Sequence, residues 1–295
     1  MNNYRIIAIG DNVCDKYLSR GKMYPGGQCV NTCAYTRMNG GDAAYLGKFG
    51  TDGAADHIKH VLNELSIDYS HSRTYEGENG FALVTMNGSD RVFLGSNRGG
   101  IAKEHPFAFN EEDFEYIKGF SIIYTNLSSY IENDIRILAE TGVPVAFDFS
   151  DRRDPEYVEM IAPYVKVALL SCADLDDRER EQWMRCVHEA GAETVVGTVG
   201  ENGSYVLYDD EYLYAPAMRA ENIIDTMGAG DSYFAAFLYH LMSSSAGRQL
   251  VEEDSSRMRD RIHDAMVKAA DFAAHVCELE GAFGFGTEIT GRTSL

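Results

Sequence analysis

The residues whose types and spacing could do chemistry form a Gly-Ala-Gly-Asp segment at positions 228–231. Large apolar side chains recur every three or four positions over 234–241, which predicts a helix that begins near Asp231. Glycine-rich helix starts present unobstructed N–H groups, and the helix dipole adds positive potential there. Such a site suits an anion whose charge grows during a reaction, and the adjacent carboxylate could accept a proton from an attacking hydroxyl. Taken alone, the segment would favour a tight turn with a capping aspartate.

The wider segment favours the chemical interpretation. Residues 225–231, Asp-Thr-Met-Gly-Ala-Gly-Asp, resemble the second signature of the ribokinase/PfkB carbohydrate kinases. The resemblance implies that Asp231 is the catalytic base. It also implies a monovalent cation, expected to be K⁺, beside this loop. The residues that would bind the phosphoryl group are Gly228, Ala229 and Gly230, and those that would hold the cation are Asp225 and, through its carbonyl, Met227.

Segments that resemble the family's sugar site come earlier in the chain. Residues 26–31 are similar to its Gly-Gly-x-x-x-Asn signature, and an acidic stretch follows the first predicted strand. Carboxylates and amides suit sugar hydroxyls because they accept and donate hydrogen bonds at fixed geometry. One basic residue on a predicted hairpin could offset developing negative charge, or could simply be an exposed strand residue. The sugar-site residues implied are Asp11, Asn12, Asp15, Gly26, Gly27, Asn31 and, on that hairpin, Arg91.

The nucleotide side of the site is implied by later segments. Residues 198–204 look like the family's ATP-site turn between two strands, and 269–276 with 281–284 look like its adenine-side helix and closing loop. The alanines of that helix would also fit close helix packing, and the two roles are compatible. The ATP contacts implied are Thr198, Gly200, Gly203, Ala270, Ala274 and Gly281.

The segment that would position Mg²⁺ departs from the family pattern. Most members carry Asn-x-x-Glu where this chain has Ser171-Cys172-Ala173-Asp174. Asp174 could still hold a water molecule on Mg²⁺, whereas Ser171 is a shorter ligand than Asn. The change keeps open a nucleotide- or sugar-binding regulator without turnover, although the complete Gly-Ala-Gly-Asp segment argues against it.

Shorter segments indicate the substrate. Residues 9–12, 90–93, 147–151 and 224–228 resemble the fructoselysine 6-kinase subfamily. We therefore expect MgATP-dependent phosphorylation of a primary hydroxyl on a ketose-type sugar, specifically the fructosyl 6-hydroxyl of fructoselysine or a related fructosamine. The alternative substrates are 2-keto-3-deoxygluconate, ribose, fructose and nucleosides. The chain has no Walker A motif, and no Gly-x-Gly-x-x-Gly follows its first strand, which argues against a dinucleotide enzyme.

The elements that must position these residues alternate along the chain. Strand–helix alternation predicts an α/β fold in which helices cover both faces of a mostly parallel sheet. An Asn-Gly turn at 87–90 predicts a hairpin. We expect one domain over 1–295, with a small β-sheet lid formed from about 12–25 and 78–100. Strands are predicted at 5–9, 43–46, 121–124, 144–147, 165–170 and 194–198, a second hairpin at 204–214, and helices at 29–38, 54–64, 111–118, 131–140, 155–162 and 178–190.

Composition limits the partners. The 295 residues carry 26 Lys and Arg against 46 Asp and Glu, a formal net charge of −20. So acidic a surface repels nucleic acid and anionic membranes, and we expect neither as a partner. The six cysteines form no Cys-x-x-Cys pair and are expected to be reduced thiols of a cytoplasmic protein. The lid could pair with a second copy in a homodimer.

Overall fold

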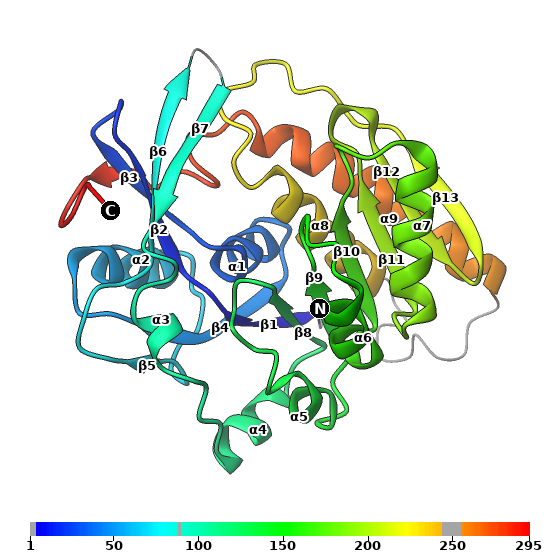
Figure 1. Ribbon diagram of the computed structural model, residues 1–295, viewed down its shortest axis with the longest axis horizontal. Helices are drawn as coiled ribbons and strands as arrows, with labels where there is room; N and C mark the ends of the chain where they lie inside the picture. The colour runs from blue at the N-terminus through cyan, green and yellow to red at the C-terminus, as the bar shows by residue number, and fades with distance from the viewer. Residues whose placement is uncertain (1–3, 88–89, 244–254) are drawn as a thin grey trace.

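The computed structural model describes residues 4–87, 90–243 and 255–295. In this part of the chain the larger sheet has nine strands in the order β13-β12-β11-β10-β9-β8-β1-β4-β5 (Figure 1). The strands from β11 to β5 run parallel, and β12 and β13 are antiparallel at one edge. The strands are β1 (Arg5–Gly10), β4 (Asp42–Phe49), β5 (Arg73–Thr74), β8 (Ile122–Asn126), β9 (Val145–Asp148), β10 (Val167–Ser171), β11 (Thr194–Thr198), β12 (Ser204–Tyr208) and β13 (Glu211–Ala215).

Both faces of this sheet are buried. In β1, Ile6 and Ala8 join the hydrophobic cluster on one face, and Ile7 and Ile9 join the cluster on the other. Successive strand residues point to opposite faces, so a strand that is apolar at every position must be covered on both sides. The predicted helix-covered parallel sheet is therefore confirmed.

Two groups of helices provide that cover. Helices α1, α2, α8 and α9 contribute to one cluster, and α4 to α7 contribute to the other. Asn110 and Asp176 form capping boxes at the starts of α4 and α7, which satisfy backbone N–H groups there. The helices are α1 (Gln28–Met38), α2 (Gly53–Glu64), α3 (Ile101–Glu104), α4 (Glu111–Ile117), α5 (Ile135–Ala139), α6 (Pro155–Ile161), α7 (Asp177–Glu189), α8 (Ala229–Ser243) and α9 (Ser255–Val276), with 3₁₀ turns at Ala162–Tyr164 and Gly200–Asn202.

A second sheet of five strands, in the order β14-β3-β2-β6-β7, lies where the lid was expected, and its β6–β7 hairpin projects from the main body (Figure 1). The tip of the predicted Asn-Gly turn, residues 88–89, lies outside the described residues. The sequence did not predict β14, which comes from the C-terminal segment. The Lys16 ammonium fixes that segment by donating to the Thr290 carbonyl at 2.9 Å and the Arg292 carbonyl at 2.7 Å. The strands are β2 (Val13–Tyr17), β3 (Lys22–Gly26), β6 (Phe81–Asn87), β7 (Asp90–Ser96) and β14 (Thr287–Glu288).

Two further expectations can be compared with the structure. The helix predicted at 131–140 is shorter and begins at Ile135. All six cysteines are free thiols, as expected. Within the described ranges, none of the helices combines the length and apolarity needed to cross a membrane.

Candidate active site

The carboxyl ends of three adjacent parallel strands form the centre of the site. Asp11 follows β1, Asn126 ends β8 and Asp148 ends β9. The Asn126 side-chain amide donates to Asp11 Oδ1 at 2.7 Å, so the ends of β1 and β8 are tied together. Ligands of open parallel sheets bind just beyond the carboxyl ends of the strands.

Asp11 is built into the N-terminus of α1. Its Oδ2 accepts the Gln28 N–H at 2.9 Å, and its Oδ1 accepts the Cys29 N–H at 3.1 Å. Gly27 permits this approach: its φ is +93°, and an added Cβ would lie 3.0 Å from Asp11 Oδ2 and 2.8 Å from the Asn12 Cα. With the bond from β8, Asp11 accepts three hydrogen bonds, where a carboxylate offers about four positions.

The other two sequence-predicted polar residues here differ in role. Asp15 is buried on β2, and an added Cβ at Gly26 would lie 2.4 Å from its Oδ2, so glycine leaves the room this carboxylate needs. The Asn12 amide instead points inward. It donates to the Tyr45 hydroxyl at 2.6 Å and the Lys48 carbonyl at 2.8 Å, and its Oδ1 accepts from a buried asparagine amide at 2.8 Å. These contacts make Asn12 a positioning residue that joins β1 to β4.

Asp231 lies in the first turn of α8 and is partly exposed. Its Oδ2 accepts a hydrogen bond of 2.7 Å from the Asn31 amide of α1. The structure therefore brings the two predicted signatures together across 200 residues of sequence. Asn31 Oδ1 is buried without a hydrogen-bond partner among the described residues, which leaves one acceptor for a ligand hydroxyl.

The glycines before Asp231 shape the start of α8. Gly228 has a φ of +74°, and an added Cβ would lie 2.1 Å from the Tyr35 hydroxyl. At Gly230 an added Cβ would meet no described atom within 4 Å, so the space beside the first turn is open. The Ala229 N–H makes a long contact of 3.3 Å to the Thr226 carbonyl. Because the first N–H groups of a helix lack intrahelical partners, this open end can bind an anion.

Sequence reasoning missed two participants, Asp148 and Gln28. Asp148 is buried, and its carboxylate accepts the Gln28 side-chain amide at 2.7 Å and the Ser150 N–H at 2.7 Å. Burial, and then the negative charge of Asp231, raises the pKa of Asp148 well above its usual range. In the sequence, Asp148 stands out only as part of segment 147–151, which resembles the fructoselysine 6-kinase subfamily. Its position directly after a buried strand was the available signal.

The predicted ATP contacts are spread over three elements. Thr198 ends β11, and Gly200 is exposed in the turn that follows it. Gly203 is buried, and an added Cβ would lie 2.2 Å from the Ala215 carbonyl. Ala270 is buried in the core through α9, whereas Ala274 on the same helix is partly exposed. Gly281 lies against the second sheet, where an added Cβ would come within 2.6 Å of the Tyr24 ring. These nucleotide contacts stay predictions.

The predicted magnesium residue already has a partner. Arg153 donates to both Asp174 oxygens, at 2.8 and 2.5 Å, and to the Ser171 carbonyl at 2.8 Å. The Arg153 guanidinium lowers the pKa of the exposed Asp174 carboxyl. Among the described residues, no three His, Cys, Asp or Glu side chains gather to hold a metal ion.

The predicted cation residue, Asp225, is also engaged. Its Oδ1 accepts the Met227 N–H at 3.0 Å, and its Oδ2 accepts the Tyr17 hydroxyl at 2.7 Å. The guanidinium Nη1 of Arg20 lies 3.8 Å from the same Oδ2. The remaining predicted residue, Arg91, belongs to β7, and its side chain lies outside the described part of the structure.

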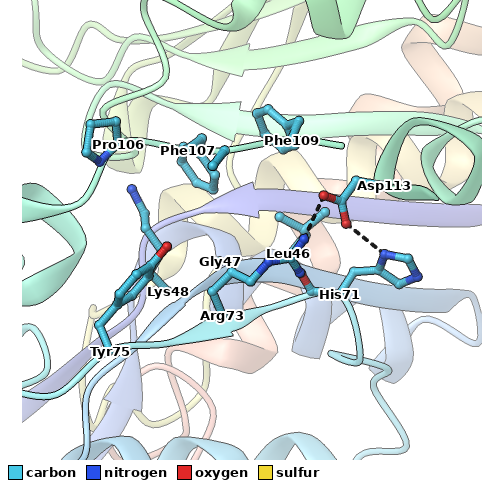
Figure 2. A pocket seen from close by; sticks show the side chains of 11 residues that line it. Leu46, Gly47, Lys48, His71, Arg73, Tyr75, Pro106, Phe107, Phe109 and Asp113 are labelled. Atoms are coloured by element: carbon cyan, nitrogen blue, oxygen red, sulfur yellow. Dashed lines mark hydrogen bonds and ion pairs between the residues drawn. The ribbon is translucent and has the colours of Figure 1, made fainter. Parts of the chain in front are cut away.

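A separate pocket beside β4 has an architectural role (Figure 2). Asp113 accepts hydrogen bonds from His71 and Arg73, each at 2.8 Å. The Lys48 ammonium donates to the His105 carbonyl at 2.7 Å and lies 3.8 Å from the centre of the Phe107 ring. Burial lowers the pKa of Lys48 to about 8. These internal partners fix the loops around β4.

Solved structures share this fold. Ribokinase from Arabidopsis thaliana, complexed with ribose and ATP, superposes with a TM-score of 0.74 at 16% identity, over 96% of this chain and 95% of that one. A ribokinase-like structure from Escherichia coli with ATP and Mg²⁺ superposes with a TM-score of 0.73 at 17% identity, over 95% and 94%. The architecture is therefore the ribokinase-like α/β fold.

Sequence relatives give the family. The model of the pfkB family of carbohydrate kinases matches residues 2–282. Fructosamine kinase FrlD of Bacillus subtilis (strain 168) is 37% identical over 283 residues, covering 96% of this chain and 94% of the relative. Fructoselysine 6-kinase of Escherichia coli (strain K12) is 32% identical over 233 residues, covering 79% and 87%. The chain belongs to the pfkB family of carbohydrate kinases, and it is a phosphotransferase that acts on a sugar hydroxyl.

Proposed function

We propose that this kinase transfers the γ-phosphoryl group of MgATP to the fructosyl 6-hydroxyl of fructoselysine or a closely related fructosamine. The observation that carries the proposal is Asp231, held by Asn31 in the first turn of α8 beside the open space at Gly230. A carboxylate in this position can take the proton of a hydroxyl that attacks an anion bound at the helix end. The names of the two relatives described above support the substrate class.

Different residues of the site would bind the sugar, face the phosphoryl group and take the proton. Asp11 and Asp15 would hold sugar hydroxyls, and the buried Asn31 Oδ1 would accept one more hydrogen bond. The first-turn N–H groups of α8 would face the transferring phosphoryl group, where negative charge develops. Asp231 would receive the proton from the 6-hydroxyl.

Magnesium would enter with the nucleotide and neutralise phosphate charge. Mg²⁺ prefers oxygen ligands and is usually held by one or two carboxylates together with phosphates and water. Asp174 could contribute through a water molecule only after it had released Arg153. A monovalent cation is not needed at Asp225, because this carboxylate already faces Arg20.

The substrate is tested by parallel kinetics on fructoselysine, fructose, ribose, 2-keto-3-deoxygluconate and adenosine. We expect the highest kcat/KM for fructoselysine. A site built to pair a substrate's polar groups rejects analogues that lack them, by as much as about 10⁴-fold. If another of these compounds reacts faster, the substrate assignment fails, while the family assignment stands on its own.

We also propose a homodimer through the second sheet. Its edge strand β7 presents three consecutive large apolar side chains, Val92, Phe93 and Leu94, with exposed fractions of 38%, 61% and 47%. An exposed apolar edge strand invites pairing with another chain, and a second copy would cover both faces of the strand. Light scattering after gel filtration should give twice the monomer mass for the wild type and the monomer mass for Phe93→Asp. A monomeric wild-type protein would refute this assembly.

A further inference from the structure

The loop that precedes the catalytic helix contains a buried carboxylate. Asp225 is 1% exposed, and the backbone around it is fixed because the N–H groups of Ile224 and Asp225 donate to the Cys277 carbonyl at 2.9 and 3.2 Å. An ionised carboxylate buried in protein requires hydrogen bonds and a compensating positive charge. Family resemblance implied that a monovalent cation would supply that charge.

The second sheet supplies a positive charge instead. Arg20 follows β2, and its Nη1 lies 3.8 Å from Asp225 Oδ2, which also accepts the Tyr17 hydroxyl of β2. This Nη1 is buried and has no hydrogen-bond partner among the described residues. The guanidinium also lies 5.2 Å from the centre of the Tyr17 ring, which favours a cation in that place.

A second cation is disfavoured at the same carboxylate. Oδ1 takes the Met227 N–H, and Oδ2 takes the Tyr17 hydroxyl with Arg20 alongside. A K⁺ ion bound to these oxygens would lie within a few ångströms of the guanidinium, and like charges at such separations repel strongly where little water intervenes.

We infer that Arg20 is the built-in counter-ion of the catalytic loop, and that the kinase does not require a monovalent cation. Arg20 is a positioning residue that acts through Asp225, whose Oδ1 holds the Met227 N–H directly before the Gly-Ala-Gly segment. The arrangement also couples the second sheet to the catalytic loop, because Tyr17 and Arg20 both belong to that sheet and its first turn.

The first test compares wild-type protein in sodium-free K⁺ buffer and in tetramethylammonium buffer of equal ionic strength. We expect equal kcat, equal ATP affinity by calorimetry and equal melting temperature in the two buffers. Stimulation of turnover or tighter ATP binding in K⁺ would overturn the inference. Calorimetry and melting need no sugar, so their results do not depend on the proposed substrate.

The second test asks whether removal of the Arg20 side chain makes the kinase depend on K⁺ from the buffer. Arg20→Ala should lose about tenfold or more in kcat in tetramethylammonium buffer, because it leaves a buried charge uncompensated, and K⁺ should restore part of that loss. Arg20→Lys should stay independent of K⁺. Lys22→Ala is the control, since Lys22 begins β3 directly after that turn and pairs with the exposed Glu280 at 3.3 Å.

Two results of this second test would contradict the inference. One is an Arg20→Ala protein with wild-type rates in both buffers, and the other is a Lys22→Ala protein that acquires the same K⁺ dependence. If Arg20→Ala does not fold, the melting temperatures of the wild type and of Arg20→Lys in the two buffers replace it. A rise in melting temperature specific to K⁺ in either protein would contradict the counter-ion role of Arg20.

Discussion

Two helix N-termini meet at the site, and their aspartates are engaged differently. At α1, Asp11 approaches from outside the helix and is tied to the N–H groups of Gln28 and Cys29. At α8, Asp231 belongs to the helix itself and lies beside the open space at Gly230. The N–H groups of α1 therefore serve the protein's own carboxylate, whereas those of α8 face the space that a substrate anion can enter. We therefore expect Asp11 to hold the helix start and the sugar without entering the chemistry, and Asp231 to act on the reacting hydroxyl.

The largest effect should come from Asp231→Asn. Removal of a general base typically costs about 10²- to 10⁴-fold in rate. We expect kcat to fall by that amount while ATP affinity, measured by calorimetry, stays near wild type. Asp260→Asn, an exposed substitution on α9, is the control and should leave kcat unchanged. Retention of more than about a tenth of wild-type kcat, far above that range, would remove Asp231 from the role of base.

The next effect concerns the space at the start of α1. Gly27→Ala should lower the free energy of unfolding by about 1–3 kcal/mol, because the site demands a positive φ and leaves no room for a Cβ. Gly142→Ala is the matched control, since Gly142 has a φ of +81° and an added Cβ would meet no described atom within 4 Å. Urea unfolding of both variants separates the steric clash from the backbone strain. Equal losses of unfolding free energy in the two variants would show that contact between the added Cβ and Asp11 does not destabilise the protein.

Asp11→Asn should have a smaller effect on stability, since loss of a helix-capping carboxylate typically costs about 0.5–2 kcal/mol. Its KM for sugar should rise, and its kcat should fall far less than that of Asp231→Asn. Urea unfolding and steady-state kinetics measure the two quantities. A loss of kcat equal to that of Asp231→Asn would end the distinction between the two helix starts.

The smallest effect is the pH dependence of Asp148→Asn. The raised pKa of Asp148 means that the folded protein binds its proton more tightly, so this carboxyl weakens the fold as pH rises above its unfolded value of about 3.9. The variant should therefore gain stability relative to wild type as the pH rises above about 4. Urea unfolding across that range measures the gain, and a constant difference would show that the two states bind this proton equally.

The main sheet could be predicted because its strands are short apolar runs bounded by turns. Short apolar runs and helical spacing are local properties of the chain, and they located most elements within a few residues. Two misses have physical causes. The two residues of β14 are too few to show any period. The helix at 131–140 was overextended, because apolar spacing alone does not reveal that the first four of those residues form a turn.

The site was predictable only where a local motif carried it. Asp231 and Asn31 each lie in a signature, but their hydrogen bond joins residues 200 positions apart, which no local pattern encodes. The same limit explains why the sequence did not predict two ion pairs, Arg20 with Asp225 and Arg153 with Asp174. Whether a carboxylate binds a ligand or another side chain depends on what the fold places opposite it.

The C-terminal strand affects the order in which the molecule can be assembled. Lys16 on β2 binds the Thr290 carbonyl, which lies 274 residues later, and β14 pairs with β3. Contacts at such sequence separation form late, because the loop between them must close first. During synthesis on a ribosome, β3 therefore cannot pair with β14 until almost the whole of this chain has emerged. The nascent protein must keep one edge of that small sheet unpaired throughout translation.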